Sequence, residues 1–329
     1  MPLIRTILVA VKDPWRRSLP AVEKSAQLAR ALHARLHLFH AMSEPVYVDV
    51  ADAHGRSLMS LEQGRREQVS RRLEVLAGRL QRTGIEVIPV VEWDFPPHEA
   101  VIRAARSADA DLIVAERHET SHHLPWLLRF TDFELLRLAP VPVLLVKSRR
   151  RYARPRVLAA VDPSHSFAKP AQLDEQIVRF GGTFATALGG ALHAVYAYDP
   201  LPLAALASEV PLGEAAEAME ASAQARARKD FARALKGTRI TPSRRHLVPR
   251  HPIDAIESTA REMDAGIVVM GAISRSGVKR LVLGNTAERV LDRLPCDVVV
   301  VKPRHFVSAV PRTRRGAQLV ALSALQVGI

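Results

Sequence analysis

Two patterns of apolar residues alternate along this chain. Short runs rich in Val, Ile and Leu are separated by longer stretches in which apolar residues recur at intervals of three and four. The first pattern predicts buried β-strands and the second predicts amphipathic helices. Their alternation is typical of an α/β fold, a parallel sheet with helices on its faces. In the first half we predict strands at 7–11, 36–41, 87–92, 112–115 and 143–146, and helices at 19–32, 61–83, 97–106 and 133–138.

The second half repeats the first at a fixed offset of 155 residues. The segments 97–102, 109–114 and 136–147 return as 252–257, 264–269 and 291–302. One offset held across three separate blocks indicates a duplicated domain. In the second copy we predict strands at 157–161, 192–198, 243–248, 267–270 and 298–301, and helices at 214–235, 253–262 and 287–294.

A length of 329 residues is long for one domain and natural for two. We therefore expect two α/β domains, each with a five-stranded parallel sheet, at 1–148 and 156–303. A linker at 149–155 joins them. Residues 304–329 form a basic and then apolar tail, which we expect to be either a disordered end or a docking helix.

The net charge of +13 favours anionic partners in general. Only 5% of the residues are aromatic, and no zinc-finger or RNA-binding motif is present, so we expect no dedicated nucleic-acid site. No apolar run approaches the roughly 20 residues that span a bilayer. The N-terminus shows no signal-peptide pattern, and Cys296 is a lone cysteine that we expect to be buried. These features predict a cytoplasmic protein.

A glycine-rich loop in the second copy carries the strongest chemical signal. It begins where the fourth strand ends, at Met270, and runs from Gly271 to Gly277. The turn 284–286 then opens the last helix, where free N–H groups and the helix dipole attract phosphate. Asp162 ends the first strand, and in a parallel sheet it belongs to the same edge as the loop. The arrangement predicts an anion-binding site at that edge.

The first copy has lost this loop. Glu116 stands opposite Gly271, Glu119 opposite Ser274, and Arg129 opposite Gly284. Two carboxylates would repel a phosphate, so we expect no such ligand in the first domain.

The end of the first strand at Asp162, the loop that starts at Gly271, the Gly284-Asn285-Thr286 turn and the closing strand resemble the universal stress protein (Usp) family. The duplication resembles its tandem, E-type members, and the resemblance covers residues 5–148 and 156–303. It implies a flavodoxin-like fold (Usp/HUP type) in each domain and a non-catalytic role in the stress response. Many members bind ATP or AMP through a Gly-x-x-Gly motif followed by nine residues and Gly-Ser/Thr.

The resemblance also implies roles for single residues. Asp162 takes the place of the acid on the adenine side, and Ala197 the strand position whose backbone contacts adenine. Two departures, Ser274 for the second motif glycine and Asn285 for the usual Ser/Thr, predict weakened binding. No metal is expected beyond an ion that accompanies the nucleotide. The candidate nucleotide-binding residues are Asp162, Ala197, Met270, Gly271, Ser274, Gly277, Gly284, Asn285 and Thr286.

Two other functions remain open at this stage. The proline-broken apolar segment 199–213 could hold a hydrophobic ligand or lipid precursor, and the loop could serve a slow ATP hydrolase. The segment 118–122 fits the HExxH pattern of zinc peptidases, but Pro125 follows it closely and leaves little room for the helix that this chemistry needs. Expected partners are other stress proteins or a second copy of the chain.

Overall fold

The structure is a computed structural model that describes residues 4–49, 56–117, 129–165, 172–200, 213–272, 290–304 and 306–322. The chain forms two compact units. One consists of residues 3–146 together with 307–329, and the other contains residues 147–306. We call them the first and the second unit.

The first unit is built on parallel strands in the order β4-β2-β1-β5-β6. Its first strand lies in the middle of the sheet, between β2 and β5, so the direction of the strand order reverses there. A parallel pair, β3 and β12, stands apart from this sheet. The elements are β1 (Thr6–Ala10), α1 (Pro20–Leu32), β2 (Arg35–Met42), β3 (Val46–Asp49), α2 (Arg56–Gln81), β4 (Val87–Trp93), α3 (Pro97–Ser107), β5 (Leu112–Glu116), α4 (Arg129–Leu138), β6 (Val143–Val146) and β12 (Leu319–Leu322).

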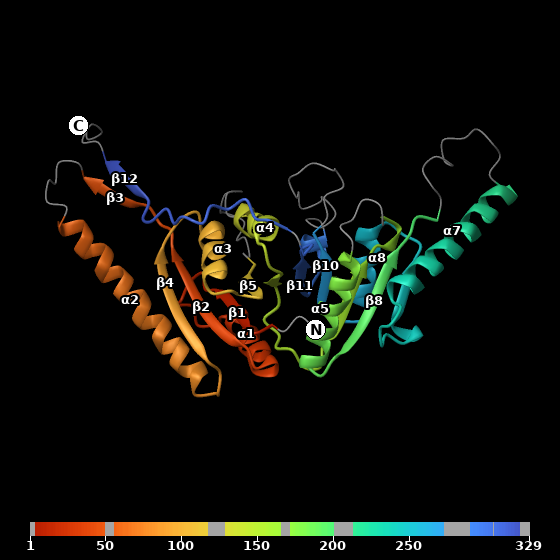
Figure 1. The fold of residues 1–329 in the computed structure, drawn as a ribbon, viewed down its shortest axis with the longest axis horizontal. Helices are drawn as coiled ribbons and strands as arrows, with labels where there is room; N and C mark the ends of the chain where they lie inside the picture. Colours follow the sequence, from red (N-terminus) through yellow and green to blue (C-terminus); the bar gives the residue numbers. More distant parts are fainter. Residues whose placement is uncertain are drawn as a thin grey trace. The chain divides into compact units, whose positions relative to one another are not determined.

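The second unit repeats this topology with parallel strands in the order β11-β10-β7-β8-β9. Figure 1 labels β8, β10 and β11 of this sheet together with helices α5, α7 and α8. Each unit is therefore a flavodoxin-like α/β domain. Its elements are β7 (Arg156–Val161), α5 (Leu173–Ala187), β8 (Ala191–Ala197), α7 (Gly213–Ala234), β9 (Arg245–Val248), α8 (Pro252–Glu262), β10 (Ala265–Gly271) and β11 (Asp297–Val301), with 3-10 turns at Pro163–His165 and Pro242–Arg244.

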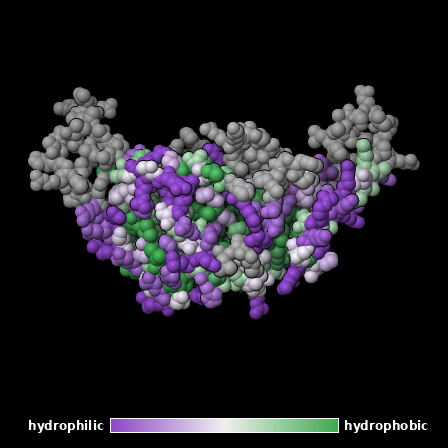
Figure 2. Space-filling view, viewed as in Figure 1, coloured by the Kyte–Doolittle hydropathy of each residue, from purple (hydrophilic) through white to green (hydrophobic). Residues whose placement is uncertain are grey.

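The central strands explain the apolar runs in the sequence. Every residue of β1 and of β11 is buried, because helices cover the sheets on both faces. The helices instead bury one stripe. In α2, Val69, Leu73 and Ala77 recur every fourth position and are buried. Figure 2 shows hydrophilic side chains along the outer edge where α2 lies.

Three features differ from the sequence-based prediction of elements. Strand β3 at Val46–Asp49 was not predicted. Helix α5 was absent from that prediction, since Gly181 and Gly182 interrupt its pattern. A Cβ on Gly181 would lie 2.8 Å from the Leu192 side chain, so the glycine allows α5 to pack closely on the sheet. The tail forms strand β12 at Leu319–Leu322 rather than a helix there.

The segment that follows β6 is hydrogen-bonded to Asp297 of the second unit. The fully buried carboxylate of Asp297 accepts hydrogen bonds from the backbone N–H groups of Lys147 (2.9 Å) and Ser148 (3.0 Å). It also accepts one from the Tyr152 hydroxyl at 2.5 Å. Burial, together with the Asp297 charge, raises the pKa of Tyr152 well above its ordinary value. The compact second unit thus starts at Lys147.

Candidate functional site

The second unit brings four of the candidate residues to one edge of its sheet. Strand β7 lies between β8 and β10, and all three strands point the same way. Asp162 directly follows β7, Ala197 ends β8, and Gly271 ends β10 with Met270 before it. The carboxyl ends of adjacent parallel strands share an edge, so the topology collects these residues where ligands of such sheets bind.

Asp162 lies half-buried in a polar setting. Its carboxylate accepts a hydrogen bond from the Ser164 hydroxyl at 2.8 Å, and its backbone N–H donates to Asp174 of α5 at 3.1 Å. Tyr196, the residue before the end of β8, lies close enough to Asp162 and Asp174 for their charges to shift the pKa of its hydroxyl. Burial raises the pKa of the Tyr196 hydroxyl, the neighbouring carboxylates raise it further, and a hydrogen bond with Ser164 opposes them. Sequence reasoning did not single out Ser164, Asp174 or Tyr196.

Gly271 has a packing reason for being glycine. A Cβ at this position would lie 2.8 Å from Cδ2 of Leu173 and 3.3 Å from Cδ1 of Ile177, both on α5. The sequence interpretation gave this glycine the task of letting the backbone approach a phosphate. The structure adds that a larger residue would collide with a buried helix. Met270, one position earlier, is itself buried and belongs to the core.

Several sequence-based predictions fall outside the described residues. They include Ser274, Gly277, Gly284, Asn285 and Thr286 of the candidate site, the HExxH segment 118–122, and most of the apolar segment 199–213. Helical residues 290–293 belong to the helix predicted at 287–294. Cys296 is buried, as expected.

At the corresponding edge of the first unit, charged residues form ion pairs. Lys12 follows β1 at the position of Asp162, and its ammonium group contacts the Asp132 carboxylate of α4 at 2.9 Å. Asp132 is buried and lies in the first turn of its helix, where the helix dipole favours an acid. Glu116, opposite Gly271, lies 3.7 Å from the Arg16 guanidinium. The first unit therefore uses these charges internally.

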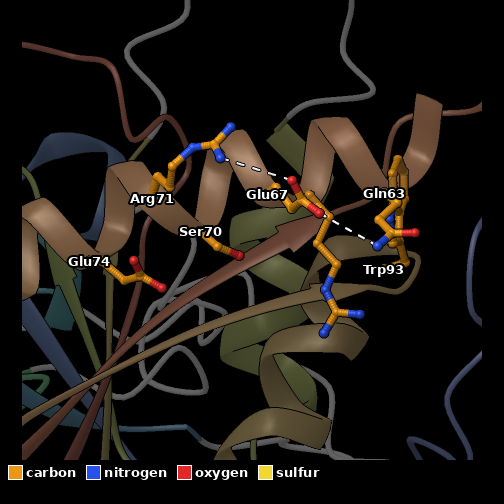
Figure 3. A pocket seen from close by; sticks show the side chains of 7 residues that line it. Gln63, Glu67, Ser70, Arg71, Glu74 and Trp93 are labelled. Carbon is orange, nitrogen blue, oxygen red and sulfur yellow. Dashed lines mark hydrogen bonds and ion pairs between the residues drawn. The ribbon is translucent and has the colours of Figure 1, made fainter. Parts of the chain in front are cut away.

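A groove of about 570 Å³ lies elsewhere in the first unit (Figure 3). At its centre Glu67 contacts Gln63 at 3.5 Å and Arg71 at 3.9 Å. None of the candidate residues lines it. Its basic and acidic side chains are equal in number, so it favours neither charge. The lining residues are Gln63, Arg66, Glu67, Ser70, Arg71, Glu74 and Trp93.

A pair of histidines bridges two strands of the second unit. The rings of His193 on β8 and His246 on β9 stack at a centroid distance of 5.4 Å, with Nδ1 and Nε2 3.1 Å apart. Burial, and then the His246 charge, lower the pKa of His193 to about 4. In the part of the chain that the structure describes, no group of three or more His, Cys, Asp or Glu is placed to hold a metal. No helix there is long and apolar enough to cross a bilayer.

The comparisons with known proteins agree with the fold. The model of the universal stress protein family matches residues 3–147 and again 154–302. The chain is 26% identical over 317 residues to universal stress protein E of Escherichia coli (strain K12), covering 94% of this chain and 98% of that protein.

Two solved structures share the architecture. A Pseudomonas aeruginosa PAO1 protein of unknown function superposes with a TM-score of 0.67 at 25% identity, over 92% of this chain and 93% of that one. A universal stress protein from Archaeoglobus fulgidus superposes with a TM-score of 0.57 at 16% identity, over 91% and 98% of the two chains, which supports the fold alone. With both halves matched by the family, the chain belongs to the universal stress protein family as a tandem member similar to the E type.

Proposed function

We propose that this protein is a non-catalytic stress-response protein of the cytoplasm whose second unit binds one adenine nucleotide, ATP or AMP. The observation that carries the proposal is the contrast between the two sheet edges. Asp162 and Gly271 sit on neighbouring strand ends in the second unit, whereas Lys12 and Glu116 hold these positions in the first and form ion pairs.

Each residue of the second edge suits one part of a nucleotide. The Asp162 carboxylate accepts hydrogen bonds, as the amino group of adenine or a ribose hydroxyl would require. The small side chain of Ala197 leaves its backbone accessible to a flat base. In the sequence, Gly284 opens the turn before the last helix, where backbone N–H groups favour an anion. The one metal we expect at this site is an ion bound to the phosphates of the nucleotide.

The test is a calorimetric titration of the full chain with ATP and with AMP. We expect at most one site per chain. Gly284→Glu should weaken binding about a hundred-fold or more, because charge-assisted hydrogen bonds worth about 1.5–3 kcal/mol each give way to like-charge repulsion. Arg129→Glu makes the matched change in the first copy and should leave the affinity unchanged.

Two results would contradict the proposal. Equal affinity of the Gly284→Glu variant, with an unchanged circular dichroism spectrum, would place the ligand elsewhere. Loss of binding in the Arg129→Glu variant alone would assign the nucleotide to the first unit. Mass spectrometry of the purified protein adds an independent check, since a retained acyl species would favour a lipid-type ligand instead.

A further inference from the structure

The segment 307–318 leaves the second unit and lies against the first (Figure 1). The Arg106 guanidinium on α3 donates hydrogen bonds to the backbone carbonyls of Val310 at 2.7 Å and Ser308 at 3.1 Å. At its far end, the carbonyl of Gln318 accepts a hydrogen bond from the backbone N–H of Val46 at 2.7 Å, and β12 then pairs with β3. We call this segment the clasp. It is held by its backbone at both ends.

Between these ends, the clasp places two arginines on three carboxylates, Glu92, Asp94 and Glu99, which we call the acidic recess. Arg314 forms an ion pair with Glu92 at 2.7 Å. Arg315 contacts the recess through its backbone and through its side chain. Its backbone N–H donates to Asp94 at 3.0 Å, and its guanidinium contacts Glu99 at 3.0 Å.

The recess is organised from behind by a buried arginine. The Arg103 side chain is 2% exposed and donates from Nε and Nη2 to the fully buried Asp94 at 2.6 and 2.9 Å. Its remaining amino group donates to Glu99 at 2.9 Å. Charge-assisted forks of this kind fix the planes and positions of carboxylates. Asp94 and Glu99 are therefore oriented by the fold and not by the clasp alone.

The clasp arginines add positive charge where the carboxylates of the recess gather. Arg103 contacts Asp94 and Glu99, the charges of Arg66 and Arg103 also act on Glu92, and the two clasp arginines supply the remaining contacts to the three carboxylates. Glu92 has room for a further hydrogen-bond donor, because its Oε2 atom is buried and has no hydrogen-bond partner among the described residues. Burial raises the pKa of Glu92, and the Arg314 charge opposes that shift. The Arg315 guanidinium also lies over the Phe95 ring, 5.7 Å from its centre.

The second copy has no such recess. At the offset of 155 residues, Glu92 corresponds to Leu247 and Asp94 to Pro249. Arg103 corresponds to Ser258, which carries no charge and whose hydroxyl donates to the carbonyl of Ala255 at 3.3 Å. The recess therefore arose in the copy that uses its ligand edge for internal ion pairs.

We propose that the acidic recess is a receptor for an extended peptide carrying two adjacent arginines, and that the clasp is its resident ligand. Asp94 and Arg106 bind the backbone of the peptide, and the carboxylates of Glu92 and Glu99 bind its guanidinium groups. Such a site is a peptide-recognition surface filled in cis, and a segment of the same chemistry can replace the clasp.

Hydrogen exchange on the full chain tests the hold of the recess on the clasp. In a Glu92→Gln/Glu99→Gln variant, backbone amides at 309–318 should exchange at least about ten-fold faster, because the charged contacts that hold the clasp are lost. Glu86→Gln is the matched control, since Glu86 pairs with Arg35 and not with the clasp. Unchanged exchange at 309–318 in the double variant, with β1 and β5 still protected, would overturn the proposal.

A second measurement keeps the test independent of any loss of folding. The full chain with Arg314→Gln/Arg315→Gln serves as receptor, and a fluorescent peptide of residues 307–318 serves as probe. The peptide should bind this receptor more tightly than the parent chain, whose own clasp competes at an effective concentration in the millimolar range. Binding should weaken with added salt.

The control peptide carries glutamine at both arginine positions and should not bind. Equal binding of the two peptides would show that the arginines are not recognised. A failure of the arginine peptide to bind the freed receptor would equally overturn the proposal. Neither result depends on nucleotide binding by the second unit.

Discussion

The carboxyl edges of the two sheets show what a duplicated fold can exchange without losing its strands. In the second unit this edge presents Asp162 beside a glycine that packs on α5. In the first unit the same positions hold Lys12 and Glu116, each paired with another side chain of that unit. The two sheets share one strand order, and their central strands are buried in both units. The edge residues lie outside that core, so the two copies can carry different residues there, as Asp162 and Lys12 do.

The largest expected effect breaks the buried charge network of Asp94, Glu99 and Arg103 in the first unit. Arg103→Met leaves the fully buried Asp94 without its guanidinium, and removing one partner of a buried pair costs about 3–5 kcal/mol. All three tryptophans lie in the first half of the sequence, so urea unfolding followed by tryptophan fluorescence reports on the first unit.

The matched change in the second unit is Ser258→Ala, which should alter the unfolding free energy by about 0.5 kcal/mol or less. A fluorescence midpoint that is the same for Arg103→Met and the parent would show that the network contributes nothing to the first unit. An equally large loss on Ser258→Ala would remove the difference between the units.

The next effect concerns the glycine at the second edge. Gly271→Ala pushes a methyl group to within 2.8 Å of Leu173, and overpacking of this kind costs about 1–3 kcal/mol. Circular dichroism follows both units, so the loss should appear there without a matching shift in tryptophan fluorescence.

Gly78→Ala supplies a control of opposite sign. Gly78 lies in helix α2, and a Cβ there meets only the end of the Arg82 side chain at 4.0 Å. Alanine in a helix is favoured over glycine by about 0.5–1 kcal/mol, so this variant should be more stable than the parent. If Gly271→Ala proves as stable as the parent, packing on α5 does not explain the glycine.

The smallest effect is a pH dependence in the second unit. The pKa of His193 in the folded chain is lowered to about 4 from its ordinary value of 6.5, so the unfolded chain binds more protons between these values. The stabilising contribution is complete above pH 6.5 and is lost as the pH falls towards 4. His193→Gln should therefore reduce the decline of the circular dichroism midpoint over this window.

The tryptophan transition serves as the internal control for this variant. His37, His40 and His98 of the first unit also have lowered pKa values through burial, and the substitution leaves them in place. If the circular dichroism midpoints of the parent and the variant fall in parallel between pH 6.5 and 4, His193 does not contribute to the pH dependence of stability.

Most of the fold follows from local patterns in the sequence. The β-branched runs predict β1, β5 and β11 because both faces of a parallel sheet are buried. The pairing of β12 with β3 could not be predicted, because the two strands are more than 250 residues apart and neither shows a distinctive pattern. Helix α5 was missed for a different reason, since its glycines serve contact with the sheet.

The candidate site was predictable to a similar extent. The order of strands alone collects Asp162, Ala197 and Gly271 at one edge. The ion pair of Lys12 with Asp132 joins residues 120 positions apart, and no local pattern announces it. The acidic recess could not be predicted either. In the sequence Asp94 and Arg103 have the pattern of ordinary surface charges, and only the structure shows that they form a buried pair.

The path of the clasp has a consequence for synthesis on the ribosome. Strand β6 ends at Val146, but the residues that fill the acidic recess lie beyond Val307. At about 5–20 residues per second, the first unit waits on the order of ten seconds or more after its own sheet has been made. During that interval Glu92, Asp94 and Glu99 lack their contacts with the clasp, and β3 lacks its pairing with β12. The first unit is thus the first to emerge and the last to be completed.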